Sequence, residues 1–260
     1  MTKQDYDAVI SRVTDILGSD LCDVTEMAFL YGSTCVGEVV PGLSDIDFAV
    51  VCKGNEVEID VMRRYADAFR PVLCDPRTRS IWYRPFMLYN SRGFRAILES
   101  RGSYLFFLRS TGRQIFGPKA KLPEPDIDRV RKELVERVTS FEKYGYLVNE
   151  FFRCWESAFL EKRMFSTLEH SLVADGQSIS AAMGKEIPVL RPEIYKVLEE
   201  HAAEIGDPDL PGEVWKKRSS WGKWSPRIEY LQDLYLRTVR FYLGTFRLLK
   251  KSSGDLTCNS

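Results

Sequence analysis

The chain has 260 residues, 44% of them hydrophobic, so it can bury a sizeable core as one large domain or two modest ones. Lysine plus arginine and aspartate plus glutamate each total 37, and this balance disfavours wholesale electrostatic binding to nucleic acid or to an anionic membrane. The six cysteines form no Cys-x-x-Cys pair, and no window approaches about 18 apolar residues, so we expect a cytoplasmic protein with free thiols, no zinc site and no membrane span.

The first part of the chain shows helix and strand patterns in turn. Residues 4–17 carry apolar side chains at 3.6-residue spacing, which predicts a helix. The apolar run at residues 27–31 predicts a buried strand, and residues 46–52 predict the next one. Between them, residues 32–44 contain three glycines and a proline, so we expect a loop with at most one helical turn.

Mixed patterns continue along the next stretch of the chain. The amphipathic residues 56–69 predict a helix. Two strands are predicted after it, at residues 71–75 and 81–89, with a turn between them. Residues 94–108 have a helical pattern, and residues 113–116 predict a short edge strand. This half of the sequence is therefore typical of a mixed α/β domain.

The character of the sequence changes at residues 119–125, which contain two prolines and no clear periodicity and are typical of a linker. Beyond the linker only helical patterns occur, at residues 127–141, 151–160, 168–183, 192–205 and 226–249. The last pattern has one broad apolar face and begins with Ser225-Pro226, a favourable pair for a helix start. We therefore expect one domain over residues 1–118 and an all-helical domain over residues 126–252.

The clearest chemical pattern is Gly32-Ser33 followed, after an eleven-residue loop, by Asp45-Ile46-Asp47. Residues two apart in a strand point to the same face, so Asp45 and Asp47 present both carboxylates together while Ile46 faces the apolar side. Two neighbouring carboxylates repel each other, and a divalent cation that prefers oxygen ligands, such as Mg²⁺, relieves that repulsion. Gly32 lets the backbone approach a phosphate closely, and Ser33 adds a hydroxyl and an N–H group.

A plainer interpretation of this pattern is a strand-entry turn with two solvated aspartates, because short motifs often match by chance. The ordered combination favours the functional interpretation: an apolar strand, Gly-Ser, a loop, then Asp-x-Asp opening a second apolar strand. We therefore take Gly32 and Ser33 as nucleotide-binding candidates, and Asp45 and Asp47 as catalytic and metal-binding candidates.

This combination resembles the signature of the DNA polymerase beta-like nucleotidyltransferase superfamily, in which Gly-Ser, a variable loop and Asp-hydrophobic-Asp follow one another. Gly32, Ser33, Asp45 and Asp47 match that signature position by position. The resemblance implies a small mixed-sheet core in which Asp45 and Asp47 hold Mg²⁺. It also implies transfer of a nucleoside monophosphate from a nucleoside triphosphate to a hydroxyl, with release of pyrophosphate and two metal ions stabilising the reacting oxygens.

The layout of the whole chain, a mixed α/β half followed by a helical half, is similar to the aminoglycoside nucleotidyltransferases and related antibiotic-modifying enzymes. This resemblance implies an α+β protein that transfers AMP from ATP to a small-molecule acceptor such as an antibiotic. Residues 1–118 would be the catalytic domain, and residues 126–252 a helical substrate-binding or accessory domain that completes the acceptor pocket. Nucleic acid is not favoured as a partner, no membrane is expected, and a monomer and a homodimer both stay open.

The sequence departs from the family pattern at the third carboxylate, which the family usually carries on a later core strand. The predicted strand at residues 81–89 contains no acidic residue. Asp75 is the nearest substitute, although a turn residue before Pro76 is the plainer interpretation. The departure leaves open a ligand from elsewhere, a single well-bound metal, or a catalytically impaired or antitoxin-like protein that acts by binding a partner. Transfer to a protein or to an RNA end is a further alternative.

Three other groups of residues each have two interpretations. Three glutamates are available as a catalytic base, but the sequence does not distinguish them from ordinary solvated helix residues: Glu99, Glu150 and Glu156. A basic region could contact a triphosphate or a nucleic-acid backbone, or could be ordinary surface charge: Arg77, Arg79, Arg84, Arg92 and Arg95. Interleaved aromatic and basic side chains could stack on a ring substrate or pin a loop to the helical domain: Trp215, Lys216, Lys217, Arg218, Trp221, Lys223 and Trp224.

Overall fold

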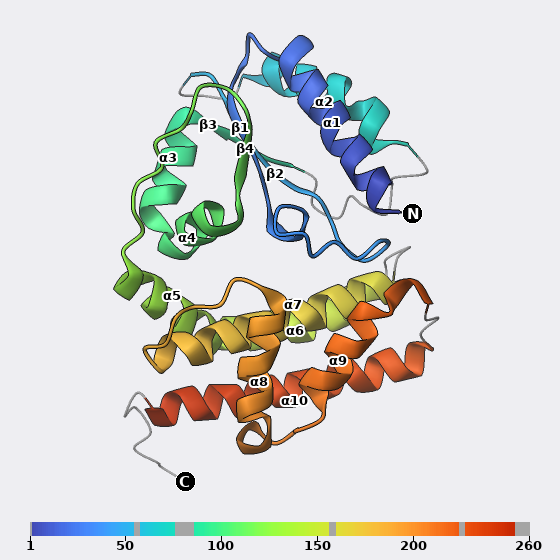
Figure 1. Cartoon of the computed structure of the whole chain (residues 1–260), viewed down its shortest axis with the longest axis vertical. Coiled ribbons are helices and arrows are strands. Elements are labelled where there is room, and N and C mark those ends of the chain that lie inside the picture. The colour runs from blue at the N-terminus through green and yellow to red at the C-terminus, as the bar shows by residue number, and fades with distance from the viewer. Residues whose placement is uncertain (1, 55–57, 76–85, 156–159, 224–226, 253–260) are drawn as a thin grey trace. The chain divides into compact units, whose positions relative to one another are not determined.

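The computed structural model describes residues 2–54, 58–75, 86–155, 160–223 and 227–252 (Figure 1). The chain divides into two compact units, Met1–Pro125 and Asp126–Ser260. The division falls at the end of the proline-containing segment that is typical of a linker in the sequence. Each unit buries its own set of apolar side chains.

A four-stranded sheet with the order β3-β2-β1-β4 forms the centre of the first unit. Its strands are β1 (Thr25–Tyr31), β2 (Asp47–Cys52), β3 (Phe86–Asn90) and β4 (Arg113–Phe116). β1 pairs antiparallel with both β2 and β4, whereas β3 runs parallel to β2. The sheet is therefore mixed, as predicted, and the short strand predicted at residues 113–116 is confirmed as its edge.

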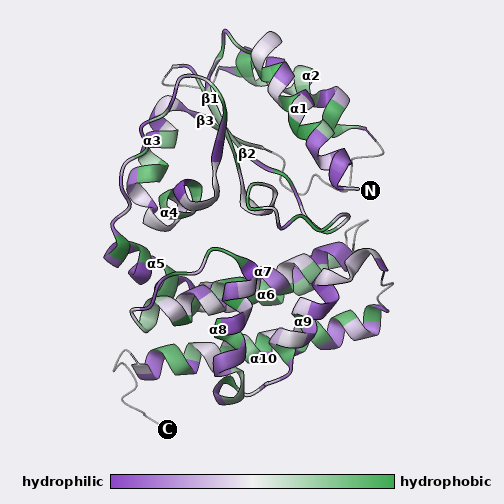
Figure 2. Ribbon diagram, in the orientation of Figure 1, coloured by the Kyte–Doolittle hydropathy of each residue, from purple (hydrophilic) through white to green (hydrophobic). Residues whose placement is uncertain are grey.

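Helices cover both faces of the sheet (Figure 1). They are α1 (Lys3–Ser19) and α2 (Ile59–Leu73) on one face, and α3 (Ser91–Ser100) and α4 (Gly102–Thr111) on the other. Leu30 and Phe48 point into the core under α1 and α2, whereas Phe29 and Val51 point into the core under α3 and α4. This alternation follows from the strand backbone, in which successive side chains point to opposite faces. Hydrophobic and hydrophilic residues are accordingly interleaved along α1 and α2 in Figure 2.

The strand predicted at residues 71–75 is wrong, because α2 continues to Leu73 with Pro71 inside it. Tyr65, Phe69 and Val72 are spaced as one helical face, and all three are buried in the core that lies against the sheet. Burial of this face stabilises the last helical turn by more than the turn loses through the one backbone hydrogen bond that Pro71 cannot donate. Asp75 consequently follows a helix rather than a strand.

The helix predicted at residues 94–108 consists of two helices in the structure. Arg101 has φ −124° and ψ 87°, which lie outside the helical region, and α4 begins anew at the buried Gly102. Part of the strand predicted at residues 81–89 lies outside the described residues, and its described part forms β3.

The second unit is helical throughout its described part. Its helices are α5 (Ile127–Thr139), α6 (Phe141–Cys154), α7 (Leu160–Ala182), α8 (Arg191–Ile205), α9 (Leu210–Ser219) and α10 (Ile228–Ser252). α7 is the central helix, because it contacts α5, α6, α8 and α10 and most of its residues are buried. A mixed-sheet unit followed by a helical unit confirms the predicted α+β class.

The helical patterns in the sequence did not include α9. Leu210, Val214 and Arg218 are buried in it at four-residue spacing, but a ten-residue helix with an arginine on its buried face has little apolar periodicity. The helix start predicted at Ser225-Pro226 lies outside the described residues, and α10 extends beyond the predicted end to Ser252.

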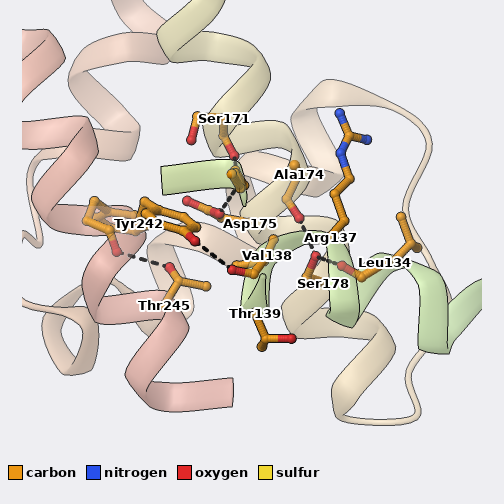
Figure 3. Close-up of polar contacts among 12 residues, drawn as sticks. Leu134, Arg137, Val138, Thr139, Ser171, Ala174, Asp175, Ser178, Tyr242 and Thr245 are labelled. Carbon is orange, nitrogen blue, oxygen red and sulfur yellow. Dashed lines mark hydrogen bonds and ion pairs between the residues drawn. The ribbon is translucent and has the colours of Figure 1, made fainter. Parts of the chain in front are cut away.

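A buried ion pair joins α6 to α7, and Figure 3 shows its carboxylate, Asp175, together with Tyr242 and Val138. Asp175 is 0% exposed, and its Oδ1 accepts a 2.7 Å hydrogen bond from Nζ of Lys143. The same ammonium group lies 4.8 Å from the ring centre of Tyr242, whose hydroxyl donates to the Val138 carbonyl at 2.8 Å. Burial raises the pKa of the Asp175 carboxyl and lowers the pKa of the Lys143 ammonium. Each of the two groups is therefore stabilised in its charged form by the other.

A second buried carboxylate of α7 ties α8 and α9 to it. Glu169 Oε1 accepts hydrogen bonds from Nε of Arg191 at 2.7 Å and from Nε of Arg218 at 2.5 Å. Burial acts to raise the pKa of Glu169, but the two arginine charges outweigh it and the pKa is lowered.

Two sequence expectations concern the chain as a whole. In the part that the structure describes, no helix combines the length and the apolar character needed to cross a bilayer. The cysteines of this part are free thiols: Cys22, Cys35, Cys52, Cys74 and Cys154.

Candidate functional site

Gly32 directly follows β1 in a backbone conformation that favours glycine. Its φ is 75°, in the left-handed region. A Cβ atom at this position would lie 2.7 Å from Oδ2 of Asp47, so the Asp47 carboxylate rests against the Gly32 backbone. The left-handed conformation favours glycine, and a Cβ here would move the Asp47 carboxylate from its present place. The two halves of the sequence motif are therefore adjacent in the structure.

The pairing of β1 with β2 produces this contact. Tyr31 is the register partner of Asp47, so the end of β1 and the start of β2 meet at one end of the sheet. Ile46 is 0% exposed and Phe48 is 1% exposed, and both lie in the core under α1 and α2. Asp45 and Asp47 alternate with them and are partly exposed. Strand alternation keeps the Asp47 carboxylate out of that core, and Asp45 lies two residues before β2.

Ser33 lies in η1 (Gly32–Thr34), a single 3₁₀ turn that follows β1. The turn is closed by hydrogen bonds from Cys35 N to the Gly32 carbonyl at 3.1 Å and from Thr34 Oγ1 to the Tyr31 carbonyl at 3.2 Å. α4 contacts η1 from the side. The single helical turn expected within residues 32–44 is confirmed, and Ser33, which is 8% exposed, follows the glycine against which the Asp47 carboxylate lies.

Tyr6 of α1 holds the segment that leads into Asp45. Its buried hydroxyl donates a 2.8 Å hydrogen bond to the Ser44 carbonyl, and Ser44 Oγ accepts one of 2.9 Å from Val40 N. Burial raises the pKa of Tyr6 to about 12, and the charge of Asp45 adds to that rise. In the sequence Tyr6 is one apolar position of a helix among several, so nothing there indicates this role.

A group of tyrosines lies on the Asp47 side of the sheet. Tyr31 and Tyr104 form an edge-to-face ring pair with centroids 6.2 Å apart, and both pack with Tyr89 in the core under α3 and α4. Burial raises the pKa of Tyr31 and Tyr104, and the charge of Asp47 contributes in both cases. The surroundings of Asp47 are therefore aromatic on this side. No motif in the sequence links these three residues.

The third family carboxylate has no counterpart in the part of the chain that the structure describes. No group of three or more His, Cys, Asp or Glu side chains that could hold a metal ion occurs there. On β3, the register partner of Ala49 is Met87, and none of the strand residues is acidic. Glu150 is 2% exposed and bonded to Arg163 at 2.9 Å, which makes it a structural ion pair. Glu156 lies outside the described residues.

The donor set of the site fits one hard divalent cation. Asp47 offers a carboxylate at the end of the sheet against the Gly32 backbone, and Asp45, two residues earlier, is partly exposed. Mg²⁺ commonly binds through one or two carboxylates and completes its shell with substrate phosphates and water. The complete two-metal arrangement implied by the family signature has fewer protein carboxylates than it needs among the described residues.

The two remaining clusters from the sequence have different outcomes. Trp215 packs on Tyr195 with ring centroids 5.2 Å apart, and Trp221 packs on Phe165 at 4.9 Å, so these tryptophans pack against helices of their own unit. Trp224 lies outside the described residues. Two of the basic candidates, Arg92 and Arg95, are exposed on α3. The other three lie outside the described residues: Arg77, Arg79 and Arg84.

No protein-family model matches the chain. No curated protein matches its sequence. Among solved structures it is similar to the crystal structure of the spectinomycin adenyltransferase AAD(9) from Enterococcus faecialis with ATP and spectinomycin. The two chains share 13% sequence identity with a TM-score of 0.54, and the similarity covers 91% of this chain and 98% of the other. At this level of identity the likeness establishes a shared fold along most of both chains.

Proposed function

We propose that the protein is a Mg²⁺-dependent nucleotidyltransferase that transfers AMP from ATP to a hydroxyl of a small-molecule acceptor such as an antibiotic. The likeness in fold to an adenyltransferase supports this proposal. The residues Gly32, Ser33, Asp45 and Asp47, which match the family signature, support it independently. In this proposal the first unit carries the nucleotide chemistry, and the helical unit is the substrate-binding or accessory part.

One observation carries the proposal: the Asp47 carboxylate lies against a glycine with a left-handed backbone. Two aspartates in a strand-entry turn need no such contact, because solvated side chains can point freely into water. Here a Cβ at residue 32 would clash with Oδ2 of Asp47 at 2.7 Å, so the turn and the carboxylate occupy one closely packed place. A phosphate bound at Gly32 would thus lie close to the Asp47 carboxylate. The two anions repel each other unless a cation lies between them.

Each residue then has a role in binding or positioning. Asp45 and Asp47 would hold Mg²⁺, which when bound neutralises phosphate charge and stabilises the developing charge of the leaving group. Ser33 and the backbone of Gly32 would bind the β- and γ-phosphates. The acceptor oxygen would attack the α-phosphorus and pass its proton to water, and the bond between the α-phosphorus and the bridging oxygen to the β-phosphate would break to release pyrophosphate. Most of the rate would come from positioning and charge stabilisation.

The second candidate function is a protein that binds a nucleotide or a partner without catalysis. It is favoured by one specific observation, the absence of a third acidic side chain grouped with Asp45 and Asp47 among the described residues. Transfer to a protein or an RNA end uses the same nucleotide site and differs in the acceptor alone. The balanced total charge of the chain disfavours a large RNA.

Pyrophosphate release in the presence of Mg²⁺ and ATP tests the proposal. We expect release that depends on an added hydroxylated acceptor from an aminoglycoside and aminocyclitol panel, together with a product whose mass rises by one AMP. Asp47→Asn should lower both signals about 10²–10³-fold. If ATP binds but no acceptor in small-molecule, protein and RNA panels yields pyrophosphate, the binding function replaces the enzymatic one.

A further inference from the structure

The two carboxylates of the candidate site are held in different ways. Asp47 is the first residue of β2 and pairs with Tyr31, so the sheet fixes its backbone. Asp45 lies two residues before β2, outside the register that pairs β1 with β2. Two carboxylates can bind one cation only when both are held at a suitable distance from it. Contacts other than strand pairing must therefore position Asp45.

The residue after Asp45 is anchored in the core of the first unit. Ile46 is 0% exposed and packs in the core under α1 and α2. This burial fixes where the chain passes on one side of Asp45. The peptide bond on the other side can still change its orientation, because the backbone has two soft dihedral angles at each residue. That orientation helps to decide where the Asp45 carboxylate points, so a second anchor is needed before it.

Tyr6 of α1 supplies an anchor on that side. It is 1% exposed, lies in the same core as Ile46, and donates a 2.8 Å hydrogen bond from its hydroxyl to the Ser44 carbonyl. This carbonyl belongs to the peptide bond that joins Ser44 to Asp45. Burial raises the pKa of Tyr6 to about 12, so the hydroxyl keeps its proton and remains a donor at neutral pH. Asp45 therefore lies between two residues that are fixed to one core.

The loop that leads into this peptide bond is itself hydrogen-bonded. Ser44 N donates to the Val40 carbonyl at 2.9 Å, and Val40 N donates to Ser44 Oγ at 2.9 Å. Earlier in the loop, Glu38 N donates to the Ser33 carbonyl at 3.0 Å. The loop is therefore bonded to the Ser33 turn at its start and to Tyr6 at its end.

We propose that Tyr6 is a positioning residue, whose hydroxyl holds the Ser44–Asp45 peptide bond so that the Asp45 carboxylate can bind the same cation as Asp47. This inference rests on the proposed function, because it names the residue that prepares the metal site for that reaction. Tyr6 is buried and acts through Asp45, without touching the nucleotide or the metal ion itself. Removal of an outer contact that orients a metal ligand commonly lowers the affinity for the metal.

Tyr65 provides a matched control in the same core. Its hydroxyl is also buried under the sheet and shares a 2.7 Å hydrogen bond with Thr25 Oγ1. Thr25 is the register partner of Cys52, so this hydrogen bond lies at the opposite end of the β1–β2 pair from Asp47. Tyr6→Phe and Tyr65→Phe each remove one buried hydroxyl group. Both variants should therefore have lower urea unfolding midpoints, by similar amounts.

Calorimetric titration with ATP, with and without Mg²⁺, tests the inference without relying on turnover. In the wild type Mg²⁺ should increase the affinity for ATP. In Tyr6→Phe this gain should be about tenfold smaller, whereas the affinity without Mg²⁺ should match that of the wild type. Tyr65→Phe should keep the full gain. In hydrogen–deuterium exchange, the amides of residues 36–45 should exchange faster in Tyr6→Phe and at the wild-type rate in Tyr65→Phe.

The outcomes separate this inference from the function beneath it. If the wild type gains ATP affinity from Mg²⁺ but Tyr6→Phe gains as much as Tyr65→Phe does, the role of Tyr6 is wrong and the proposed function stands. An equal loss of affinity with and without Mg²⁺ in Tyr6→Phe also overturns the role, because it shows a general disturbance of the site. Failure of Tyr6→Phe to fold overturns it too, since the hydroxyl would then serve the fold. If the wild type gains nothing from Mg²⁺, the proposed function fails and the inference fails with it.

Discussion

The two units treat acidic side chains in opposite ways. In the helical unit Asp175 and Glu169 are buried and each is bonded to a cation of a neighbouring helix. In the sheet unit Asp45 and Asp47 are partly exposed at the end of the sheet, beside a glycine turn. Burial with a bonded cation makes a carboxylate part of the fold, whereas exposure at a strand end makes it accessible to a ligand.

This difference separates stability from activity. A buried carboxylate that loses its cation is an uncompensated charge in a low dielectric, so its loss is felt in folding. A partly exposed carboxylate can be replaced by its amide with little effect on folding, because water solvates both forms. Substitutions in the helical unit should therefore change unfolding, and substitutions at the sheet end should change nucleotide chemistry.

The largest effect is expected for Lys143→Met, which leaves the Asp175 carboxylate buried without its 2.7 Å ammonium partner. We expect the free energy of unfolding to fall by about 3–5 kcal/mol, measured by urea denaturation. The double variant Lys143→Met/Asp175→Leu removes both charges and should regain most of that loss. Unfolding of Lys143→Met at the wild-type urea midpoint would contradict the role given to this pair.

The next largest effect is expected for a carboxylate at the end of the sheet in the first unit. Asp47→Asn should lower the rate of AMP transfer about 10²–10³-fold, as expected for removal of one preorganised charge-stabilising group. Its unfolding midpoint should stay close to that of the wild type. Asp60→Asn, in an exposed ion pair on α2, is the matched control and should change neither quantity. Equal turnover in the two variants would remove Asp47 from the chemistry.

A smaller effect is expected from Gly32→Ala. The left-handed φ of 75° should destabilise this variant by about 1–2 kcal/mol, and the added Cβ should displace the Asp47 carboxylate and weaken ATP binding. Gly37→Ala is a close control, because its φ is 77° but a Cβ there meets nothing within 4 Å. Both variants should lose similar stability in urea, and Gly32→Ala alone should lose ATP affinity. A similar affinity loss in both would show that strain, and not the Asp47 contact, matters.

The smallest effect concerns pH and the ion pairs of α10. Arg237 Nε and Nη2 bind Asp207 at 2.8 and 2.9 Å, and this hydrogen bonding lowers the pKa of Asp207. Because the pKa is lower in the folded state, the stabilisation is present above the ordinary aspartate pKa of about 4 and is lost as the pH falls below it. Arg237→Gln should therefore be less stable than the wild type at pH 7 by about 1 kcal/mol, and the gap should close near pH 2.

The more exposed pair of Arg64 with Asp23 provides the comparison for that pH series. Urea denaturation of Arg64→Gln should show little difference from the wild type at any pH. A gap for Arg237→Gln that stays constant from pH 7 to pH 2 would show that packing, and not the ion pair, causes the loss.

The local features of the site could be predicted from the sequence, because they depend on neighbouring residues. Ile46 and Phe48 alternate with Asp45 and Asp47 in the printed sequence, and strand geometry alone assigns them to opposite faces. Gly32 at the end of an apolar run likewise indicated a strand end followed by a turn.

The features that depend on packing between distant segments could not be predicted. The end of α2 was missed because Pro71 is a local helix breaker, and only the burial of Val72 beside Tyr65 and Phe69 overrides it. Tyr6 reaches the segment that leads into Asp45 from 38 residues away, through a helix. Its sequence neighbours give no sign of the motif it serves.

The central claim, that Gly32, Ser33, Asp45 and Asp47 bind a nucleotide and a metal ion, is tested most directly by calorimetry. ATP binding is measured with and without Mg²⁺ in three proteins: the wild type, Asp45→Asn and Asp47→Asn. We predict that the wild type binds ATP with Mg²⁺ and much more weakly without it. In each variant, with an unchanged unfolding midpoint, the gain from Mg²⁺ should largely disappear. Two results would contradict this assignment of Gly32, Ser33, Asp45 and Asp47. One is that the wild type does not bind ATP, and the other is that its ATP affinity is the same with and without Mg²⁺ and the same in both variants.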